Sequence, residues 1–139
     1  MVSDGGTSGE RLREAAFAAM ENAYAPYSRF RVGAAILASS GEVVTGCNVE
    51  NAAYGEALCA ERVAVAAAVA QGLTKFEEIA IASEADEPSP PCGSCRQTMS
   101  EFAPDLLIRS YARNGKLATW HLAELLPEAF DMNHLRGRP

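Results

Sequence analysis

Two short cysteine-bearing stretches restrict the possible folds of this chain more than any other feature of its sequence. The first contains Cys59 and, two residues later, Glu61; the second contains Cys92 and Cys95. A structural zinc site uses four protein ligands, whereas a catalytic zinc site uses three and leaves the fourth position to water. We therefore expect a fold that gathers the three thiolates around one Zn²⁺ with an open position. Glu61 is expected beside the metal, where its carboxylate can move protons.

Both stretches follow a loop and are expected to open a helix. Helix N-termini carry about half a positive charge and unpaired N–H groups, and such an end lowers the pKa of a thiol. Cys92 and Cys95 are three residues apart, so in a first helical turn their side chains face the same way. Cys59 is expected to come from the start of the other helix and to complete the site.

The charge of the expected centre bears on its chemistry, because Zn²⁺ with three thiolates carries a net charge of about −1. Two helix ends supply roughly +1 between them. Arg96 directly follows Cys95, and Arg62 directly follows the stretch Cys59-Ala60-Glu61. We expect both arginines to donate hydrogen bonds to sulfur and so to tune the metal. The alternative is that each arginine is a solvated or ion-paired side chain of its helix.

Composition restricts the class of protein and of partner. With 48% apolar and 22% charged residues, the chain has the composition of an ordinary globular protein of one domain. A net charge of −6 and the lack of a basic run argue against binding to nucleic acid. No apolar stretch of the sequence reaches the length of a membrane span. We therefore expect a small, diffusing substrate, no nucleic acid and no membrane.

The ends of the chain and its cysteine usage suggest a compartment. The N-terminal residues lack the basic and apolar regions of a signal peptide, so we expect a cytoplasmic protein. Four cysteines are too few for a disulfide scaffold, and in a reducing compartment a Cys-x-x-Cys is more often metal-binding or catalytic. The single domain is expected to span residues 1–139, with residues 1–8 as a disordered lead-in and 131–139 as a C-terminal tail.

Hydrophobic periodicity predicts interleaved helices and strands. Helices are expected at about 8–22, 56–71, 93–102 and, briefly, 122–126. Strands are expected at about 30–37, 43–49, 76–82, 106–111 and 117–121, the first two forming a hairpin. This order predicts the α/β class, with a mixed sheet of about five strands covered by helices on both faces.

The helix expected at about 56–71 is apolar on nearly all sides. A helix of this kind is buried all round, and a domain of this size has little material with which to cover it. We expect another subunit to supply part of the cover. The alternative is a central helix that a single chain covers completely.

Five motifs, spread from about Leu12 to Phe130, carry a resemblance to a known family. They are Tyr24-x-Pro26-Tyr27-Ser28-x-Phe30-x-Val32-Gly33-Ala34-Ala35, Gly46-x-Asn48-Val49-Glu50-Asn51-Ala52-Ala53-Tyr54, Cys59-Ala60-Glu61-Arg62, Pro91-Cys92-Gly93-x-Cys95-Arg96-Gln97 and Glu124-Leu125-Leu126-Pro127-x-x-Phe130. Cys-Ala-Glu with Pro-Cys-x-x-Cys resembles the zinc deaminases. The whole set resembles the small, homotetrameric, zinc-dependent cytidine deaminases of pyrimidine salvage, which implies their three-layer α/β/α fold.

The resemblance also implies roles for individual residues. The implied zinc ligands are Cys59, Cys92 and Cys95, the implied proton shuttle is Glu61, and the implied surroundings of the metal are Arg62, Arg96 and Gln97. The implied contacts to the ribose 3′-hydroxyl side are Asn48 and Glu50. The implied neighbours of the pyrimidine ring are Phe30 and, from another subunit, Phe130. Near the 5′ end of the substrate, across a subunit boundary, the implied residues are Ala52 and Tyr54.

The implied reaction is hydrolytic deamination of cytidine and 2′-deoxycytidine to uridine and 2′-deoxyuridine, with release of ammonia. Water adds to C4 of the cytosine ring while Glu61 protonates N3. Glu61 then delivers a second proton to the departing amine. No residue of the sequence can be tied to the 2′-hydroxyl, so a preference between the two substrates is not predicted.

Three alternative functions remain open. A non-catalytic structural zinc module would use Cys47 as a fourth ligand, and a thiol–disulfide oxidoreductase would use Cys92 and Cys95 alone. A deaminase of antibiotic nucleosides, such as a blasticidin S deaminase, would share the zinc chemistry.

Four of the implied substrate contacts can also be judged from the residues themselves. Phe30 could be a core residue at the start of a strand, and Phe130 a docking anchor near the chain's end. Asn48 and Glu50 flank one strand residue and point to one face. Two polar groups on one face of an apolar strand need partners, which favours a binding site.

Overall fold

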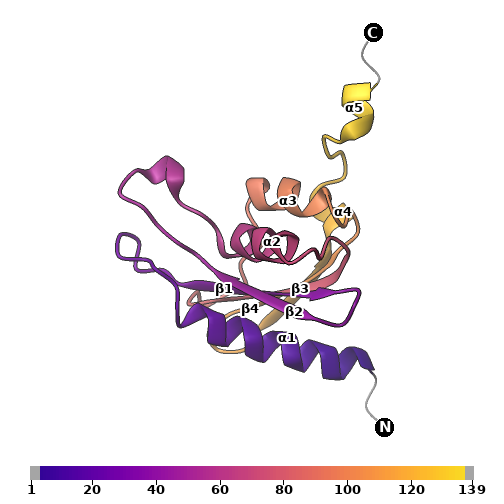
Figure 1. Ribbon diagram of the computed structural model, residues 1–139. Coiled ribbons are helices and arrows are strands. Elements are labelled where there is room, and N and C mark those ends of the chain that lie inside the picture. The colour runs from indigo at the N-terminus through magenta and orange to yellow at the C-terminus, as the bar shows by residue number, and fades with distance from the viewer. Residues whose placement is uncertain (1–3, 137–139) are drawn as a thin grey trace.

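A five-stranded mixed sheet forms the centre of the protein in a computed structural model that describes residues 4–136 (Figure 1). Its strands are β1 Val32–Ala38, β2 Val43–Cys47, β3 Phe76–Ser83, β4 Leu107–Tyr111 and β5 Leu117–His121. Their order is β2-β1-β3-β4-β5, with β3 and β4 parallel and all other neighbours antiparallel. The α/β class and the mixed sheet of five strands are therefore confirmed.

Helices cover both faces of this sheet and complete three layers, as the sequence predicted (Figure 1). One face carries α1 Asp4–Met20, and the opposite face carries α2 Ala60–Ala70 and α3 Gly93–Ser100. The remaining elements are short: a 3-10 turn at Tyr54–Glu56, α4 Leu122–Leu125 and α5 Met132–Arg136. In Figure 1, α5 lies apart from the sheet, on the segment that leads to the C-terminus.

The central strands are buried on both faces because their side chains alternate between two apolar clusters. Along β1, Ala34 and Ile36 belong to the cluster under α2 and α3, whereas Ala35 and Leu37 belong to the cluster under α1. This is the period of two expected of a strand. The sequence of a central strand covered on both faces is therefore a continuous apolar run, without alternation of apolar and polar residues.

Two glycines allow the helices to approach the sheet closely. A Cβ at Gly33 would lie 2.0 Å from the carbonyl oxygen of Ala16 in α1. A Cβ at Gly46 would lie 2.5 Å from the backbone nitrogen of Ala64 in α2. Neither distance can be tolerated, so these glycines fix the depth at which each helix packs. Gly46 thereby sets the position of the helix that carries Glu61.

Three elements start more than one residue away from the predicted position. The first helix begins at Asp4 and not near Ser8, because adding a turn to a helix that packing has already nucleated costs little. Residues 4–8 are thus helical in place of the expected lead-in, and residues 1–3 and 137–139 lie outside the described part of the chain. The expected tail also contains the short helix α5.

The other two boundaries affect the site directly. The helix expected from about 56 begins at Ala60, so Cys59 is its N-cap. The strand expected from Phe30 begins at Val32, because side chains and not a neighbouring strand hold the backbone before it.

One expectation about burial holds only in part. The outer side of α2 is exposed in the single chain at Ala66, Val69 and Ala70, although its inner side is fully buried. Within residues 4–136, none of the helices has the length and apolar character that crossing a membrane requires.

Candidate active site

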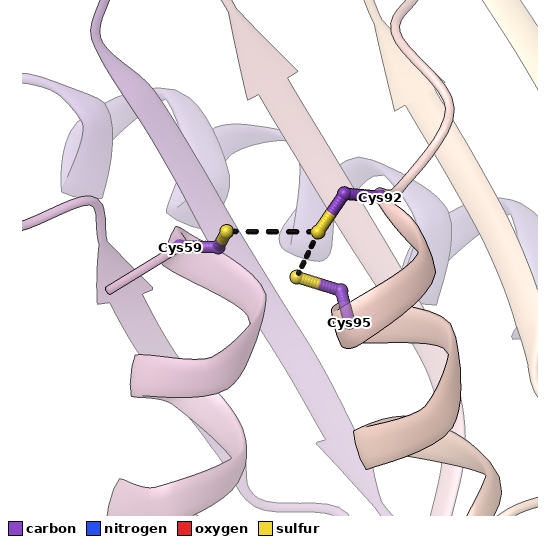
Figure 2. A group of neighbouring side chains, drawn as sticks. All are labelled: Cys59, Cys92 and Cys95. Atoms are coloured by element: carbon purple, nitrogen blue, oxygen red, sulfur yellow. Dashed lines mark hydrogen bonds between the residues drawn. The ribbon is translucent and has the colours of Figure 1, made fainter. Parts of the chain in front are cut away.

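The three predicted cysteines meet at the ends of two helices (Figure 2). Cys59 is the N-cap of α2, Cys92 is the N-cap of α3, and Cys95 lies in the first turn of α3. Cys92 Sγ lies 3.8 Å from Cys59 Sγ and 3.4 Å from Cys95 Sγ, and all three sulfurs are within 4.8 Å of one another. Tetrahedral zinc with Zn–S bonds of about 2.3 Å needs sulfurs about 3.8 Å apart. The cluster therefore fits this metal.

The surroundings of the cluster favour thiolates. Neither N-cap cysteine uses its side chain to cap its helix, so unpaired N–H groups of both first turns remain near the sulfurs. Hydrogen bonding to the Cys95 thiol, followed by that from the Arg62 guanidinium, lowers the pKa of Cys59 to about 5. The same bond to Cys59, together with burial, raises the pKa of Cys95. The three sulfurs thus share protons that a metal ion would displace.

Cys47 does not belong to this cluster. It ends β2 opposite Gly33 in the sheet, and the group of potential ligands found among the described residues consists of Cys59, Cys92 and Cys95. A closed site with Cys47 as fourth ligand, which a purely structural zinc module would need, is therefore not formed.

Arg62 makes the sulfur contact that its sequence position predicted. Its Nη2 donates to the carbonyl oxygen of Ala57 at 3.2 Å and to Cys59 Sγ at 3.9 Å. The negative sulfur raises the pKa of Arg62 in return. Its Nε is buried and has no hydrogen-bond partner within residues 4–136. The guanidinium is held against the cluster and not in solvent.

Arg96 does not make the expected contact to sulfur, and Gln97, expected near the metal, bonds the backbone instead. Arg96 donates from Nε to the Pro91 carbonyl at 2.8 Å and from Nη1 to the Leu125 carbonyl at 2.9 Å. Gln97 Nε2 donates to the Phe130 carbonyl at 2.7 Å. The expectation of an Arg96–sulfur bond is therefore wrong in this structure. Both side chains instead tie α3 to the C-terminal part of the chain, because carbonyls without sheet partners lie within their reach.

Glu61 is a buried carboxylate directly beside the cluster. It occupies the first turn of α2 and is only 6% exposed. Burial, with a smaller contribution from the negative Cys59, raises its pKa to about 7. A carboxyl group with such a pKa can both accept and return a proton near neutral pH, which is what a general acid–base group requires.

A cavity of about 470 Å³ opens onto Glu61 and two of the cysteines. Its volume is in the range of small-molecule sites. Four residues implied as substrate contacts line it: Phe30, Asn48, Glu50 and Tyr54. A second hollow of about 290 Å³ shares Glu50 and Tyr54 with the first. The site thus continues from the cysteines outward past Glu50.

Two implied substrate contacts are not brought to this cavity within one chain. Ala52 is exposed and does not line it. Phe130 is 58% exposed and lines a different groove beside α5. The sequence assigned Phe130 to a neighbouring subunit, so a single chain cannot show its contact with substrate.

Glu50 is held as a charged acceptor at the outer end of the cavity. It accepts hydrogen bonds from the Ser28 hydroxyl, from Tyr27 N at 2.9 Å and from Ser28 N at 3.1 Å. The bonds from Ser28 are the main reason that the pKa of Glu50 is lowered. Carboxylates have more lone pairs than these donors use, so Glu50 can still accept from a hydroxyl.

Asn48 is partly occupied by the chain itself. Its Nδ2 donates to the Phe30 carbonyl at 2.8 Å, and its Oδ1 accepts from Val32 N at 2.9 Å. One N–H and one lone pair remain for a ligand.

Sequence reasoning did not identify Ser28 as part of this site. Its hydroxyl accepts from Phe30 N at 3.0 Å, which is a local turn pattern of serine. The signal was therefore present in Pro26-Tyr27-Ser28, but its link to Glu50 crosses 22 residues of sequence.

Comparisons with known proteins agree with this geometry. Residues 7–109 match the family model described as the cytidine and deoxycytidylate deaminase zinc-binding region. The chain is 44% identical over 128 residues to a cytidine deaminase of Halalkalibacterium halodurans, covering 89% of this chain and 97% of that protein. A crystal structure of cytidine deaminase from Burkholderia pseudomallei superposes with a TM-score of 0.84 at 47% identity, covering 87% of this chain and 98% of that one. A blasticidin-S deaminase of Bacillus cereus is 32% identical over 114 residues, covering 76% and 81%.

Proposed function

The chain belongs to the cytidine and deoxycytidylate deaminase family, and on that basis we propose that it hydrolyses cytidine and 2′-deoxycytidine to the corresponding uridines and ammonia. The observation that carries this proposal is the meeting of three sulfurs and the buried Glu61 at one cavity.

Cys59, Cys92 and Cys95 would hold one zinc ion per chain. The bound metal supplies a water of lowered pKa as the nucleophile. Three protein ligands leave a position open for that water, which is the arrangement of catalytic and not of structural zinc. Arg62 and the two helix N-termini offset the negative charge of the thiolates.

Glu61 moves the protons of the reaction. It takes a proton from the attacking water and gives it to N3 of the cytosine ring, which makes C4 more electrophilic. It then takes the remaining proton from the hydroxyl group on C4 and gives it to the exocyclic amine, so that the C4–N bond breaks, ammonia leaves and the carbonyl of uridine forms. A pKa of about 7 suits both directions of transfer.

The substrate is held by groups along the same cavity. Phe30 lies where its ring can stack on the pyrimidine, and Glu50 lies where its carboxylate can accept from a ribose hydroxyl. A site built to hydrogen-bond a hydroxyl discriminates strongly against compounds that lack it. Asn48 adds one free N–H on the same side.

We further propose that the active enzyme is a homotetramer with composite sites. The outer side of α2 exposes apolar residues that a second subunit would cover, including Val69 at 39% exposure. Phe130 and Tyr54 are large apolar side chains left 58% and 80% exposed by the single chain. Contacts of Ala52 and Phe130 with substrate would then cross a subunit boundary, whereas Tyr54, expected to do the same, lines the cavity of its own chain.

The cysteines support a reducing compartment, and we propose the cytoplasm. All four are free thiols in the structure, and thiolate ligands must stay reduced to bind metal. A disulfide oxidoreductase would need only Cys92 and Cys95, and would leave Cys59 and Glu61 without a function.

Ammonia release tests the proposed function. Purified, zinc-loaded protein is incubated with cytidine, 2′-deoxycytidine and blasticidin S in parallel. We expect turnover of the first two compounds and little turnover of the antibiotic. Turnover of blasticidin S alone would indicate that the chain is a deaminase of antibiotic nucleosides. If none of the three compounds releases ammonia, the proposal is contradicted.

A further inference from the structure

The backbone that carries Phe30 is irregular, and yet the N–H groups of residues 30–32 are all hydrogen-bonded. Arg29, the preceding residue, has a φ of 58°, which is an unfavourable value for a residue with a side chain. Such a conformation persists only where its surroundings impose it. The strand β1 begins at Val32, two residues after Phe30. Hydrogen bonds between strands therefore do not fix the position of Phe30.

Three side chains supply the backbone around Phe30 with the hydrogen bonds that a neighbouring strand would otherwise supply. The Ser28 hydroxyl accepts from Phe30 N, and Asn48 bonds both the Phe30 carbonyl and Val32 N. The third is Glu84, whose Oε1 accepts from Arg31 N at 2.8 Å. Each backbone N–H from Phe30 to Val32 therefore donates to a side chain.

Glu84 is placed for this contact by the register of the sheet. Val32 pairs with Ser83 in the antiparallel β1–β3 ladder, so Arg31 and Glu84 stand opposite each other one step beyond its end. The Glu84 carboxylate then takes the position that a strand carbonyl would have, and accepts the Arg31 N–H.

The same carboxylate also holds the Arg31 side chain. Glu84 Oε2 accepts from Arg31 Nε at 3.0 Å and from Arg31 Nη2 at 2.8 Å. Backbone and guanidinium of one residue are thus bound by one carboxylate, a more restrictive arrangement than an isolated surface ion pair. Arg31 Nη1 reaches Glu21 at 3.4 Å, which adds a link to the chain just after α1.

Glu84 and Arg31 do not line the substrate cavity. They border a separate hollow on the surface, whereas Phe30 and Val32, the neighbours of Arg31, line the cavity. Alternation of side chains along an extended segment explains this division. Any effect of Glu84 on the reaction therefore acts through these two neighbours, of which Phe30 carries the aromatic ring that can stack on a pyrimidine.

We propose that Glu84 is a positioning residue, which clamps Arg31 and thereby fixes the ring of Phe30 against the pyrimidine of the substrate. This inference rests on the proposed function, because it assigns the cavity to a pyrimidine nucleoside. A ring that stacks equally on substrate and transition state contributes uniform binding, so loosening it raises KM and leaves kcat nearly unchanged.

Steady-state kinetics with cytidine test the proposal. Stacking of a base on an aromatic ring contributes enough that Phe30→Ala should raise KM by about tenfold or more. Glu84→Ala should raise KM by about three- to tenfold with kcat within about twofold of wild type. Glu84→Gln keeps an acceptor for Arg31 N but loses the charge, so its KM should lie between those of wild type and Glu84→Ala. If Glu84→Ala folds poorly, the KM of Glu84→Gln provides the test in its place.

Glu87→Ala is the matched control. This variant removes a carboxylate of the same loop. Glu87 pairs with Lys116 at 2.7 Å, and the side chains that bond the Phe30 segment are others, namely Ser28, Asn48 and Glu84. Its KM should equal that of wild type. In the Phe30→Ala background, Glu84→Ala should add no further increase in KM, because the ring it positions is gone.

Two outcomes would overturn the inference. The first is kinetic, and applies if wild type deaminates cytidine normally: either KM is unchanged in Glu84→Ala, or Glu84→Ala raises KM by the same factor in the wild-type and Phe30→Ala backgrounds. The other is unchanged amide hydrogen exchange over residues 29–32 in Glu84→Ala, a measurement that does not depend on activity. Wild-type protein that fails to deaminate cytidine would instead contradict the proposed function, while the exchange measurement would still decide whether the clamp exists.

Discussion

At the scale of single residues, the site depends on cysteine at two helix N-cap positions. Side chains usual at an N-cap accept a hydrogen bond from the first turn of the helix. Cys59 and Cys92 have the extended backbone of an N-cap but make no such bond. Their sulfurs are left free for a metal, while the helix N-termini still favour negative charge there.

Arg62 is expected to contribute to metal retention through Cys59. In Arg62→Gln, the donor to Cys59 Sγ is lost and the pKa of this thiol rises toward its ordinary value. Protons then compete better with zinc, and we expect the metal affinity to fall about tenfold or more. Competition with a chromophoric chelator at neutral pH measures this. Arg113→Gln, which removes an exposed pair with Asp86, is the control and should bind zinc as wild type does. Equal affinity in both variants would count against the role of Arg62.

At the scale of elements, sequence patterns identified all five strands and the three long helices. Strands such as Val32–Ala38 and Phe76–Ser83 can be recognised in the sequence as apolar runs, because central strands are buried on both faces. The cysteine stretches also indicated that the ligands lie at helix starts, although the helix expected from about 56 begins at Ala60. These signals are local, or are fixed by a single chemical requirement.

Other features could not be predicted because they depend on contacts between distant segments. The start of β1 at Val32 follows from side chains of Asn48 and Glu84, which lie far along the chain. The bonds of Arg96 depend on where the Leu125 carbonyl comes to rest. A sequence motif names such residues without showing their partners.

The packing of α2 against β2 makes Gly46 sensitive to any side chain. In Gly46→Ala, the new Cβ would meet the backbone of Ala60 and Ala64 at 2.7 and 2.5 Å. Overpacking of this kind costs about 1–3 kcal/mol, so we expect the midpoint of thermal unfolding to fall by several degrees. We also expect weaker zinc binding, since α2 carries Cys59 at its start. Gly55→Ala, with open space around its Cβ, should unfold near the wild-type temperature. A stable Gly46→Ala variant would show that α2 does not pack as described.

At the scale of the whole molecule, the single chain leaves the outer part of its site open. Tyr54 and Phe130 are exposed, and Ala52 lies outside the cavity. Assembly with other copies would close this side and would link activity to oligomeric state. Size-exclusion chromatography with light scattering should therefore give about four times the 14.7 kDa mass of one chain.

Mixed assemblies test whether Phe130 acts on a neighbouring site. Glu61→Gln and Phe130→Ala chains, each weakly active alone, are co-expressed with different tags and the mixed tetramers isolated. If Phe130 completes a neighbour's site, about a quarter of the sites in random mixtures contain both intact residues, and activity exceeds that of either variant. If Phe130 acts within its own chain, mixing restores nothing, and activity stays at about half that of Phe130→Ala.

The most direct test of the central claim compares zinc content and turnover in wild type and Glu61→Gln. The glutamine fills the same space but cannot carry the proton, and the ligands Cys59, Cys92 and Cys95 are untouched. We predict one zinc per chain in both proteins and a kcat for cytidine at least about a hundredfold lower in the variant. A Glu61→Gln enzyme that deaminates cytidine at the wild-type rate, or a wild-type protein that is fully active without zinc, would contradict the account.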